Sequence, residues 1–193
     1  MQRNADLTTM APKQRILEVA SRLFYTQGIH AVGIDRVIAE SFVAKATLYA
    51  HFRGKDELVA AYLALESDKW LVESTRRLTK LHLDPPAAVT ALFEMLFDVS
   101  RTPGFRGCPF INAAAEFPDQ GPVTEQIALH RLMQRRVFAE ALGAKGSSPD
   151  LLEPIFALFN GAMITAYLER RPDVIKLASK SALELLARKS DNP

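Results

Sequence analysis

Residues 34–52 read IDRVIAESFVAKATLYAHF. The apolar residues of this stretch recur at spacings that fit two short amphipathic helices, and they are Ile34, Val37 and Ile38, then Val43, Leu48 and Phe52. Between the two groups, residues 41–44 are too few for anything but a tight turn. The pattern therefore predicts a helix-turn-helix whose second helix runs from about Ala44 to His51.

The second of these helices has a side that suits DNA. It would bury Leu48 against the first helix and leave a cation, a hydroxyl, a phenol and an imidazole outside, on Lys45, Thr47, Tyr49 and His51. Such a helix fits the major groove of DNA. Helix-turn-helix shapes also occur in proteins that never touch DNA, so periodicity alone leaves both interpretations open.

Linked motifs add a family resemblance. Thr47-Leu48-Tyr49, His51-Phe52 and Lys55 follow a helix that ends in Leu23-Phe24-x-x-x-Gly28. Over about Pro12 to Tyr62 the chain resembles the N-terminal domain of TetR-family transcriptional regulators. The resemblance implies that the DNA contacts come from Lys45, Ala46, Thr47, Tyr49, His51 and Lys55. Lys45 would read a guanine or neutralise a phosphate, and His51 would touch a base or brace the helix.

Two residues depart from the family pattern. Phe42 stands at a turn position that is usually glycine, and Ala50 stands where a larger polar residue is common. Glycine accepts a positive φ without a Cβ clash, so phenylalanine there predicts strain of roughly 1–2 kcal/mol. The alternative is a turn of different shape.

Composition limits the class of protein. The chain has 193 residues, of which 48% are hydrophobic, so it can bury a substantial core as one two-part protein or two small domains. Its single cysteine, Cys108, excludes an internal disulfide framework and a Cys/His zinc cluster, and we expect this cysteine to be a small buried residue rather than a redox sensor. No run of 18 apolar residues and no signal-peptide core occurs, which predicts a soluble, cytoplasmic protein without a membrane partner.

Charge is distributed unevenly along the chain. The formal net charge is +2, but residues 1–55 carry eight basic and four acidic residues, whereas the remainder carries 16 basic and 18 acidic ones. A basic N-terminal part on a slightly acidic remainder is expected when only the first part meets phosphate. Residues 1–11 lack periodicity and are predicted to be a mobile arm, in which Arg3 could reach DNA.

The rest of the chain also reads as helices. No strand alternation or repeat occurs, and Pro and Gly separate the periodic segments, as where Asp84-Pro85 marks a helix start. We predict an all-α fold of about nine helices, with a DNA-binding domain at 1–54 and a ligand-binding and dimerisation domain at 55–193. The expected helices are 12–27, 34–40, 44–51, 54–81, 85–101, 109–117, 122–143, 150–169 and 173–188.

The segment 150–169 predicts a homodimer. It is apolar nearly all round, so its own core would cover one side and a second subunit the other. Pro154 inside it would kink the helix or mark its true start. If each of two subunits contributes this helix and the helix at 173–188, the four helices could form a bundle about a two-fold axis. The expected interface residues are Phe156, Leu158, Ile164, Leu177 and Leu185.

The family resemblance further implies a pocket for a small-molecule effector. Aromatic and methionine side chains spread over several helices fit an adaptable pocket, although each is first of all a core candidate. The apolar candidates are Phe93, Phe97, Phe110, Met133 and Met163, and the polar ones are Asn112, Glu116 and His130.

Enzymatic signatures such as GxSxG, a P-loop or HExxH do not occur in the sequence. We therefore expect no enzyme, no cofactor and no metal, but a homodimeric, ligand-responsive repressor on a palindromic double-stranded DNA operator, released by a small apolar or aromatic ligand. The alternative is a helical small-molecule-binding or enzymatic protein that has lost DNA binding, which the departures at Phe42 and Ala50 make credible.

Overall fold

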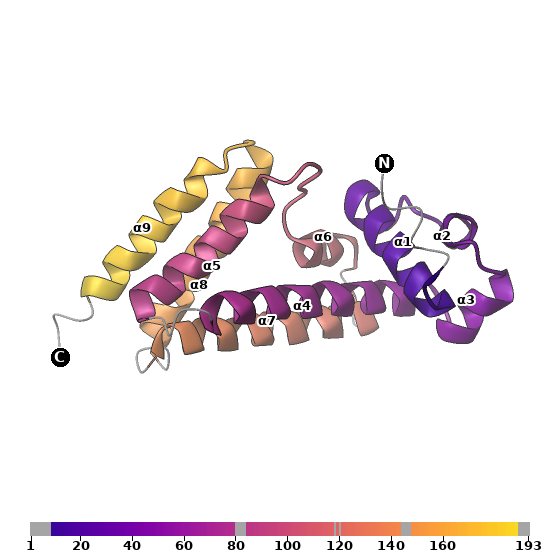
Figure 1. Cartoon of the computed structure of the whole chain (residues 1–193), viewed down its shortest axis with the longest axis horizontal. Helices are drawn as coiled ribbons and strands as arrows, with labels where there is room; N and C mark the ends of the chain where they lie inside the picture. Colours follow the sequence, from indigo (N-terminus) through magenta and orange to yellow (C-terminus); the bar gives the residue numbers. More distant parts are fainter. Residues whose placement is uncertain (1–8, 80–83, 118, 120, 144–147, 189–193) are drawn as a thin grey trace. The chain divides into compact units, whose positions relative to one another are not determined.

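The computed structural model describes residues 9–79, 84–117, 119, 121–143 and 148–188. These residues form nine α-helices and no strand, which confirms the predicted all-α fold (Figure 1). The helices are α1 Pro12–Gln27, α2 Ile34–Ser41, α3 Lys45–His51, α4 Lys55–Thr79, α5 Pro85–Ser100, α6 Pro109–Glu116, α7 Pro122–Ala141, α8 Pro149–Leu168 and α9 Asp173–Arg188. Arg3 and the expected end of α4 at Leu81 lie outside the described residues.

The chain divides into two compact units. The first comprises the residues up to Asp68 together with Pro109–Leu129, and the second comprises Lys69–Cys108 and the residues from His130 onward. The points of division fall within α4 and α7, and α6 belongs to the first unit. The functional division at residues 54 and 55 is a different partition of the chain and stays a prediction.

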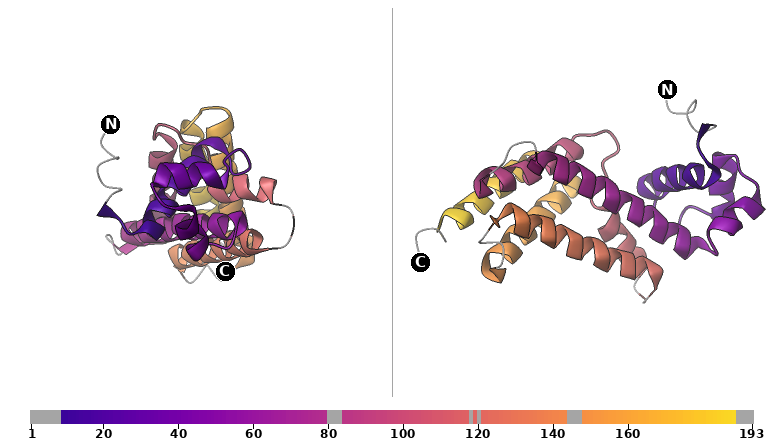
Figure 2. Two further views of the ribbon diagram at one scale, coloured as in Figure 1. Left: turned by 90° about the vertical axis from the view of Figure 1, so that its right-hand side faces the viewer. Right: turned by 60° about the horizontal axis from the view of Figure 1, so that its bottom comes forward.

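In the first unit, α1, α2 and α3 pack together near the start of α4 (Figures 1 and 2). The ring of Phe24 meets that of Tyr62 edge-on, with centroids 5.7 Å apart. Gly28 ends α1 with a φ of 95°, as its place after the apolar stripe predicted. The fully buried side chains of this unit include Ile16, Leu23, Val37, Leu48, Leu58 and Tyr62.

In the second unit, α5, α8 and α9 lie against one another (Figures 1 and 2). A cluster of aromatic rings fills the core, with Phe138 edge-on to Phe156 at 5.4 Å and to Phe159 at 5.0 Å. Phe93 of α5 meets Phe159 at 5.5 Å. Edge-to-face ring pairs stabilise a core by more than the apolar area they bury would alone. This cluster is therefore a strong packing element of the second unit.

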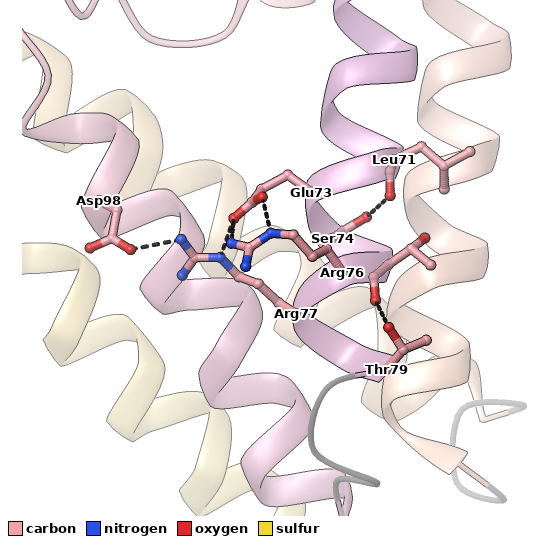
Figure 3. A network of polar contacts seen from close by, with 8 residues as sticks. Leu71, Glu73, Ser74, Arg76, Arg77, Thr79 and Asp98 are labelled. Atoms are coloured by element: carbon pink, nitrogen blue, oxygen red, sulfur yellow. Dashed lines mark hydrogen bonds and ion pairs between the residues drawn. The ribbon is translucent and has the colours of Figure 1, made fainter.

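A charged network joins α4 to α5 within the second unit (Figure 3). Glu73 accepts hydrogen bonds from Arg76 at 2.6 Å and from Arg77 at 2.7 Å, and Arg77 also donates to Asp98 of α5 at 2.7 Å. The hydrogen bonds from Arg76 and Arg77 lower the pKa of Glu73 to about 2. At the start of α5, Asp84 accepts from the Ala87 N–H at 3.0 Å, which confirms the predicted helix cap.

The sequence places Leu58, Tyr62, Leu65, Lys69, Val72 and Arg76 on one stripe of α4, apolar at first and more polar later, and beyond Leu65 this stripe is not the buried side of the helix. Val72 is 68% exposed, whereas Ser67 and Ser74 are buried. Small hydroxyl side chains cover the inward side of this part of the helix, and Ser74 satisfies its hydroxyl by donating to the Leu71 carbonyl at 2.9 Å. Because serine is not apolar, the buried side of this part of α4 gives no apolar periodicity in the sequence. Periodicity therefore could not identify that side.

The most apolar helix is α8. Its length and a mean hydropathy of 1.4 make it the one helix among the described residues that is long and apolar enough to cross a membrane. It packs against α9 and α5, and its buried side chains include Ile155, Phe156 and Phe159. Pro154 lies inside the helix, so it does not mark the start. With these contacts α8 packs as a core helix, and a core helix can be as long and apolar as one that crosses a membrane.

Candidate DNA-binding site

The turn between α2 and α3 depends on Phe42. This residue follows α2 with φ 53° and ψ 45°, the left-handed conformation, and its N–H donates to the Ala39 carbonyl at 3.3 Å. Glycine, the residue that this family usually has at this position, accepts such a positive φ most readily. The Phe42 side chain is 73% exposed, so burial offsets little of the left-handed cost of roughly 1–2 kcal/mol.

The short helix α3 separates an inner from an outer side. Leu48 is fully buried and Phe52 is 4% exposed, as predicted for packing residues. The outer side presents one continuous set of accessible residues, of which Thr47 is half-buried and the others are exposed: Lys45, Ala46, Thr47, Tyr49, Ala50 and His51. The structure therefore brings five of the six expected DNA-contacting residues together on or directly beside one accessible helix face.

Lys45 on this face is held only loosely. Its ammonium lies 3.3 Å from the carboxylate of Asp35 on α2, and the two side chains are 66% and 85% exposed. An ion pair this exposed contributes only about 0–1 kcal/mol. A DNA phosphate or a guanine edge can therefore compete for the ammonium at low cost.

Glu40 joins α2 to α1 through a charged contact that the sequence patterns did not predict. Glu40 accepts from Arg22 of α1 at 2.5 Å and from Arg36 at 2.8 Å, while Arg36 donates to Gln27 at 2.6 Å. The hydrogen bonds from the two arginines lower the pKa of Glu40. The four-residue spacing of Arg36 and Glu40 was the available sequence signal.

Lys55, the first residue of α4, is the sixth expected contact and differs from the others. It is half-buried, and its ammonium donates to the His30 carbonyl at 3.5 Å. Burial lowers the pKa of Lys55, while the charges of Glu116 and Asp56 act in the opposite direction. Its contact with DNA stays a prediction.

Known proteins share this arrangement. The sequence profile described as "Bacterial regulatory proteins, tetR family" matches residues 16–62. A TetR-family transcriptional regulator from Streptomyces coelicolor is 34% identical, with a TM-score of 0.83, over 92% of this chain and 95% of that one. The chain belongs to the TetR family of transcriptional regulators.

Curated TetR-type relatives match over shorter stretches. The transcriptional regulator LmrA of Bacillus subtilis is 31% identical over 105 residues, which are 54% of this chain and 56% of LmrA. The transcriptional activator FasR of Mycolicibacterium smegmatis is 34% identical over 84 residues, 44% of this chain and 38% of FasR. This TetR-family chain thus spans about half or less of the length of these two relatives.

The expected effector-binding residues are divided between the two units of this TetR-family protein. Phe110, Asn112 and Glu116 belong to the first unit, and the other five belong to the second. In the second unit, Phe93 is a core residue, and the half-buried ring of Phe97 lies under the Lys176 ammonium, 4.3 Å from its centroid. Met163 is buried and Met133 half-buried. Their binding of an effector stays a prediction.

His130 is buried in the second unit beside Trp70, with ring centroids 5.9 Å apart in an edge-on arrangement. Burial, followed by the charge of Arg131, lowers the pKa of His130 to about 3. The imidazole is therefore neutral at physiological pH. A neutral imidazole can take part in a hydrogen bond to an uncharged partner, but it supplies no positive charge for an anionic ligand.

The expected dimer residues fall into two groups. Ile164 is 40% and Leu177 is 58% exposed, with Leu168 on α8 exposed as well, whereas Leu158 and Leu185 are half-buried. Phe156, in contrast, lies in the core of its own chain, where the Arg131 guanidinium stacks on its ring at 4.3 Å. Phe156 therefore stays out of the proposed interface.

Among the described residues, no three His, Cys, Asp or Glu side chains are placed to hold a metal ion. Cys108 is buried, as expected for a small packing residue.

Proposed function

We propose that this TetR-family regulator is a homodimeric repressor that binds a palindromic operator in the cytoplasm and is released by a small apolar or aromatic ligand. The observation that carries the DNA-binding part is α3, which buries Leu48 and leaves Lys45, Tyr49 and His51 exposed on one short helix. The proposal includes no catalytic step and no cofactor.

The DNA-binding part is tested by selecting duplexes from a random library with the wild-type chain and measuring affinity against salt. Lys45→Ala and Tyr49→Ala should each weaken binding to the selected duplex without unfolding the protein, because both side chains are exposed. If Lys45 binds only phosphate, its loss lowers the salt slope by about one; if it reads guanine, roughly 1–3 kcal/mol of discrimination disappears at one base pair.

Lys180→Ala provides a matched control, since Lys180 is an exposed lysine on α9, away from α3 in the chain. It should keep wild-type affinity and slope. Wild-type binding by both α3 variants would refute the assignment. A flat response of the wild-type chain to every duplex would favour the alternative, a helical ligand-binding protein without DNA recognition.

The dimer is proposed on the exposed apolar side chains of α8 and α9. Two such helices from each subunit can form a four-helix bundle about a two-fold axis, which places the two α3 helices about 34–36 Å apart, one turn of DNA. Ile164→Asp and Leu177→Asp should give monomers in sedimentation equilibrium at micromolar concentration. Val72→Asp, at a 68% exposed site on α4, is the control. Dimers of unchanged stability in both α8 and α9 variants would exclude this interface.

The ligand response is proposed on α4, a continuous helix of 25 residues whose two halves belong to different units. A ligand that favours one arrangement of the units shifts their population, and a coupling of roughly 1–3 kcal/mol changes operator affinity about 5–150-fold. Small aromatic and apolar compounds are screened by thermal stabilisation, and DNA binding is then repeated with each hit. The sign of the transcriptional effect separates repressor from activator.

A further inference from the structure

The C-terminal end of α6 holds the loop that precedes α2. Glu116, the last residue of α6, accepts the Ile29 N–H on Oε1 at 3.0 Å and the His30 N–H on Oε2 at 2.5 Å. The His30 Nδ1 atom lies 3.4 Å from the same Oε2. All of these residues belong to the first unit. One carboxylate therefore binds two consecutive backbone N–H groups that are 86 and 87 residues away along the chain.

Two more contacts join the same point. The ring of Phe117 lies 5.2 Å from the ring of His30 at an interplanar angle of 32°. The Lys55 ammonium donates to the His30 carbonyl, and the negative charge of Glu116 stabilises that ammonium against the effect of burial. The loop backbone is thus bound on its N–H side by α6 and on its carbonyl side by α4.

The loop in question sets the position of the DNA-binding helices. It begins at Gly28, and its residues Ile29 and Val32 are buried. Gly33 then caps α2, with its carbonyl accepting from the Arg36 and Val37 N–H groups. Since only five residues separate Gly28 from Ile34, a shift of the loop backbone must move the start of α2.

Helix formation does not explain the carboxylate at this site. The C-terminal end of a helix carries partial negative charge, so a glutamate in the last position is unfavourable for α6 itself. The side chain is only 23% exposed, and its two oxygens are occupied by the loop. Its contacts with the loop, rather than the stability of α6, account for the carboxylate.

We propose that Glu116 is a positioning residue for DNA recognition, which ties α6 to the loop before α2 and so fixes how α2 and α3 are presented. The proposal rests on the DNA binding proposed above.

The test compares Glu116→Ala and Glu116→Gln with the wild-type chain on the duplex that the wild type selects. Glu116→Ala should lower specific affinity about tenfold or more, since hydrogen bonds to a charged group are lost. The salt slope should stay at the wild-type value, because Glu116 neutralises no phosphate. Glu116→Gln keeps one acceptor oxygen, so its loss should be intermediate. Glu125→Ala, an exposed carboxylate of the first unit, is the control and should bind as wild type.

Amide hydrogen exchange at Ile29 and His30 gives a readout that needs no DNA. Both amides should exchange faster in Glu116→Ala, and one of them in Glu116→Gln, while the amides of α8 keep their protection. Wild-type affinity together with unchanged exchange in Glu116→Ala would overturn the proposal, as would faster exchange with unchanged affinity. If the wild-type chain selects no duplex, the proposed function fails, and unchanged exchange at these two amides still refutes the contact separately.

Discussion

In the first unit, charged side chains on the surface join α2 to α1 and α6 to the loop before α2, through Glu40 and Glu116. In the second unit, the rings of Phe138, Phe156 and Phe159 meet in the interior. Exposed ion pairs are weak and are screened by salt, whereas ring packing is not. The charged links of Glu40 should therefore weaken as salt rises, whereas the ring packing of the second unit should not.

The largest effect should follow from opening the aromatic core. Phe138→Ala removes a fully buried ring and should lower the free energy of unfolding by about 3–5 kcal/mol, measured by urea denaturation and circular dichroism. Hydrogen exchange should show the loss in α5, α8 and α9. Phe97→Ala, at a half-buried ring, should cost less. An equal loss of protection in α1 to α3 would contradict the contrast between the units.

Acid should weaken the second unit before the first. The pKa of His130 is lowered from near 6.5 to about 3, so the unfolded chain binds a proton below pH 6.5 that the folded chain refuses. Stability therefore falls as pH drops from 6.5 toward 3, by up to about 1.4 kcal/mol per unit, or roughly 2 kcal/mol at pH 5. The pKa of Glu73 is lowered to about 2, so the stability that its ion pairs add is present above about pH 4.5 and is lost only as pH falls below that value.

Urea denaturation at several values between pH 6.5 and 5 measures this dependence. His130→Leu cannot titrate at this position, so the slope of stability with pH should flatten in that variant, whatever its absolute stability. A slope as steep as that of the wild-type chain would show that another group takes up the proton.

Relief of the turn should stabilise the first unit. Phe42→Gly removes the left-handed clash of roughly 1–2 kcal/mol and adds an entropic cost of about 0.5–1 kcal/mol, for a net gain near 1 kcal/mol. Thermal unfolding should show a higher melting temperature. Phe42→Ala keeps a Cβ and should not show this gain. A lower melting temperature for the glycine variant would mean that the exposed ring packs usefully.

The smallest effect should come from the surface network. Glu40→Gln weakens the link to Arg22 and Arg36 and should cost about 0.5 kcal/mol at low salt and almost nothing at 1 M salt. Because the folded pKa of Glu40 is lowered, this contribution is present above the ordinary glutamate pKa and is lost as pH falls below it. A loss of stability that does not change with salt would show that the Glu40 network behaves like a buried contact, and it would contradict the contrast between the two units.

Local signals predicted most of the helices. A proline start and a glycine end placed α1 at Pro12–Gln27, and the pair Pro172-Asp173 placed the start of α9, which runs over Asp173–Arg188. The family pattern located the left-handed turn at Phe42. These features depend on residues close together in sequence. The buried and exposed sides of α3 followed for the same reason, since one apolar residue, Leu48, decides its orientation.

Features that depend on distant residues could not be predicted in this way. Glu116 on a short helix reads as a polar group for a ligand, and only its contacts with Ile29 and His30 show what it binds in the folded chain. Phe156 lies on a helix that is apolar on all sides, so the sequence could not tell its inner from its outer face. Only the packed structure shows that the Phe156 ring lies against Arg131 and Phe138.

Trp70, described above as the edge-on neighbour of His130, is the only tryptophan in the chain. Its indole emission therefore comes from the second unit alone and responds to the polarity around the ring. Operator DNA added to the protein should change this emission only when the effect of binding travels beyond the first unit. The chain thus carries a native optical reporter that distinguishes docking confined to the first unit from a response of the second unit.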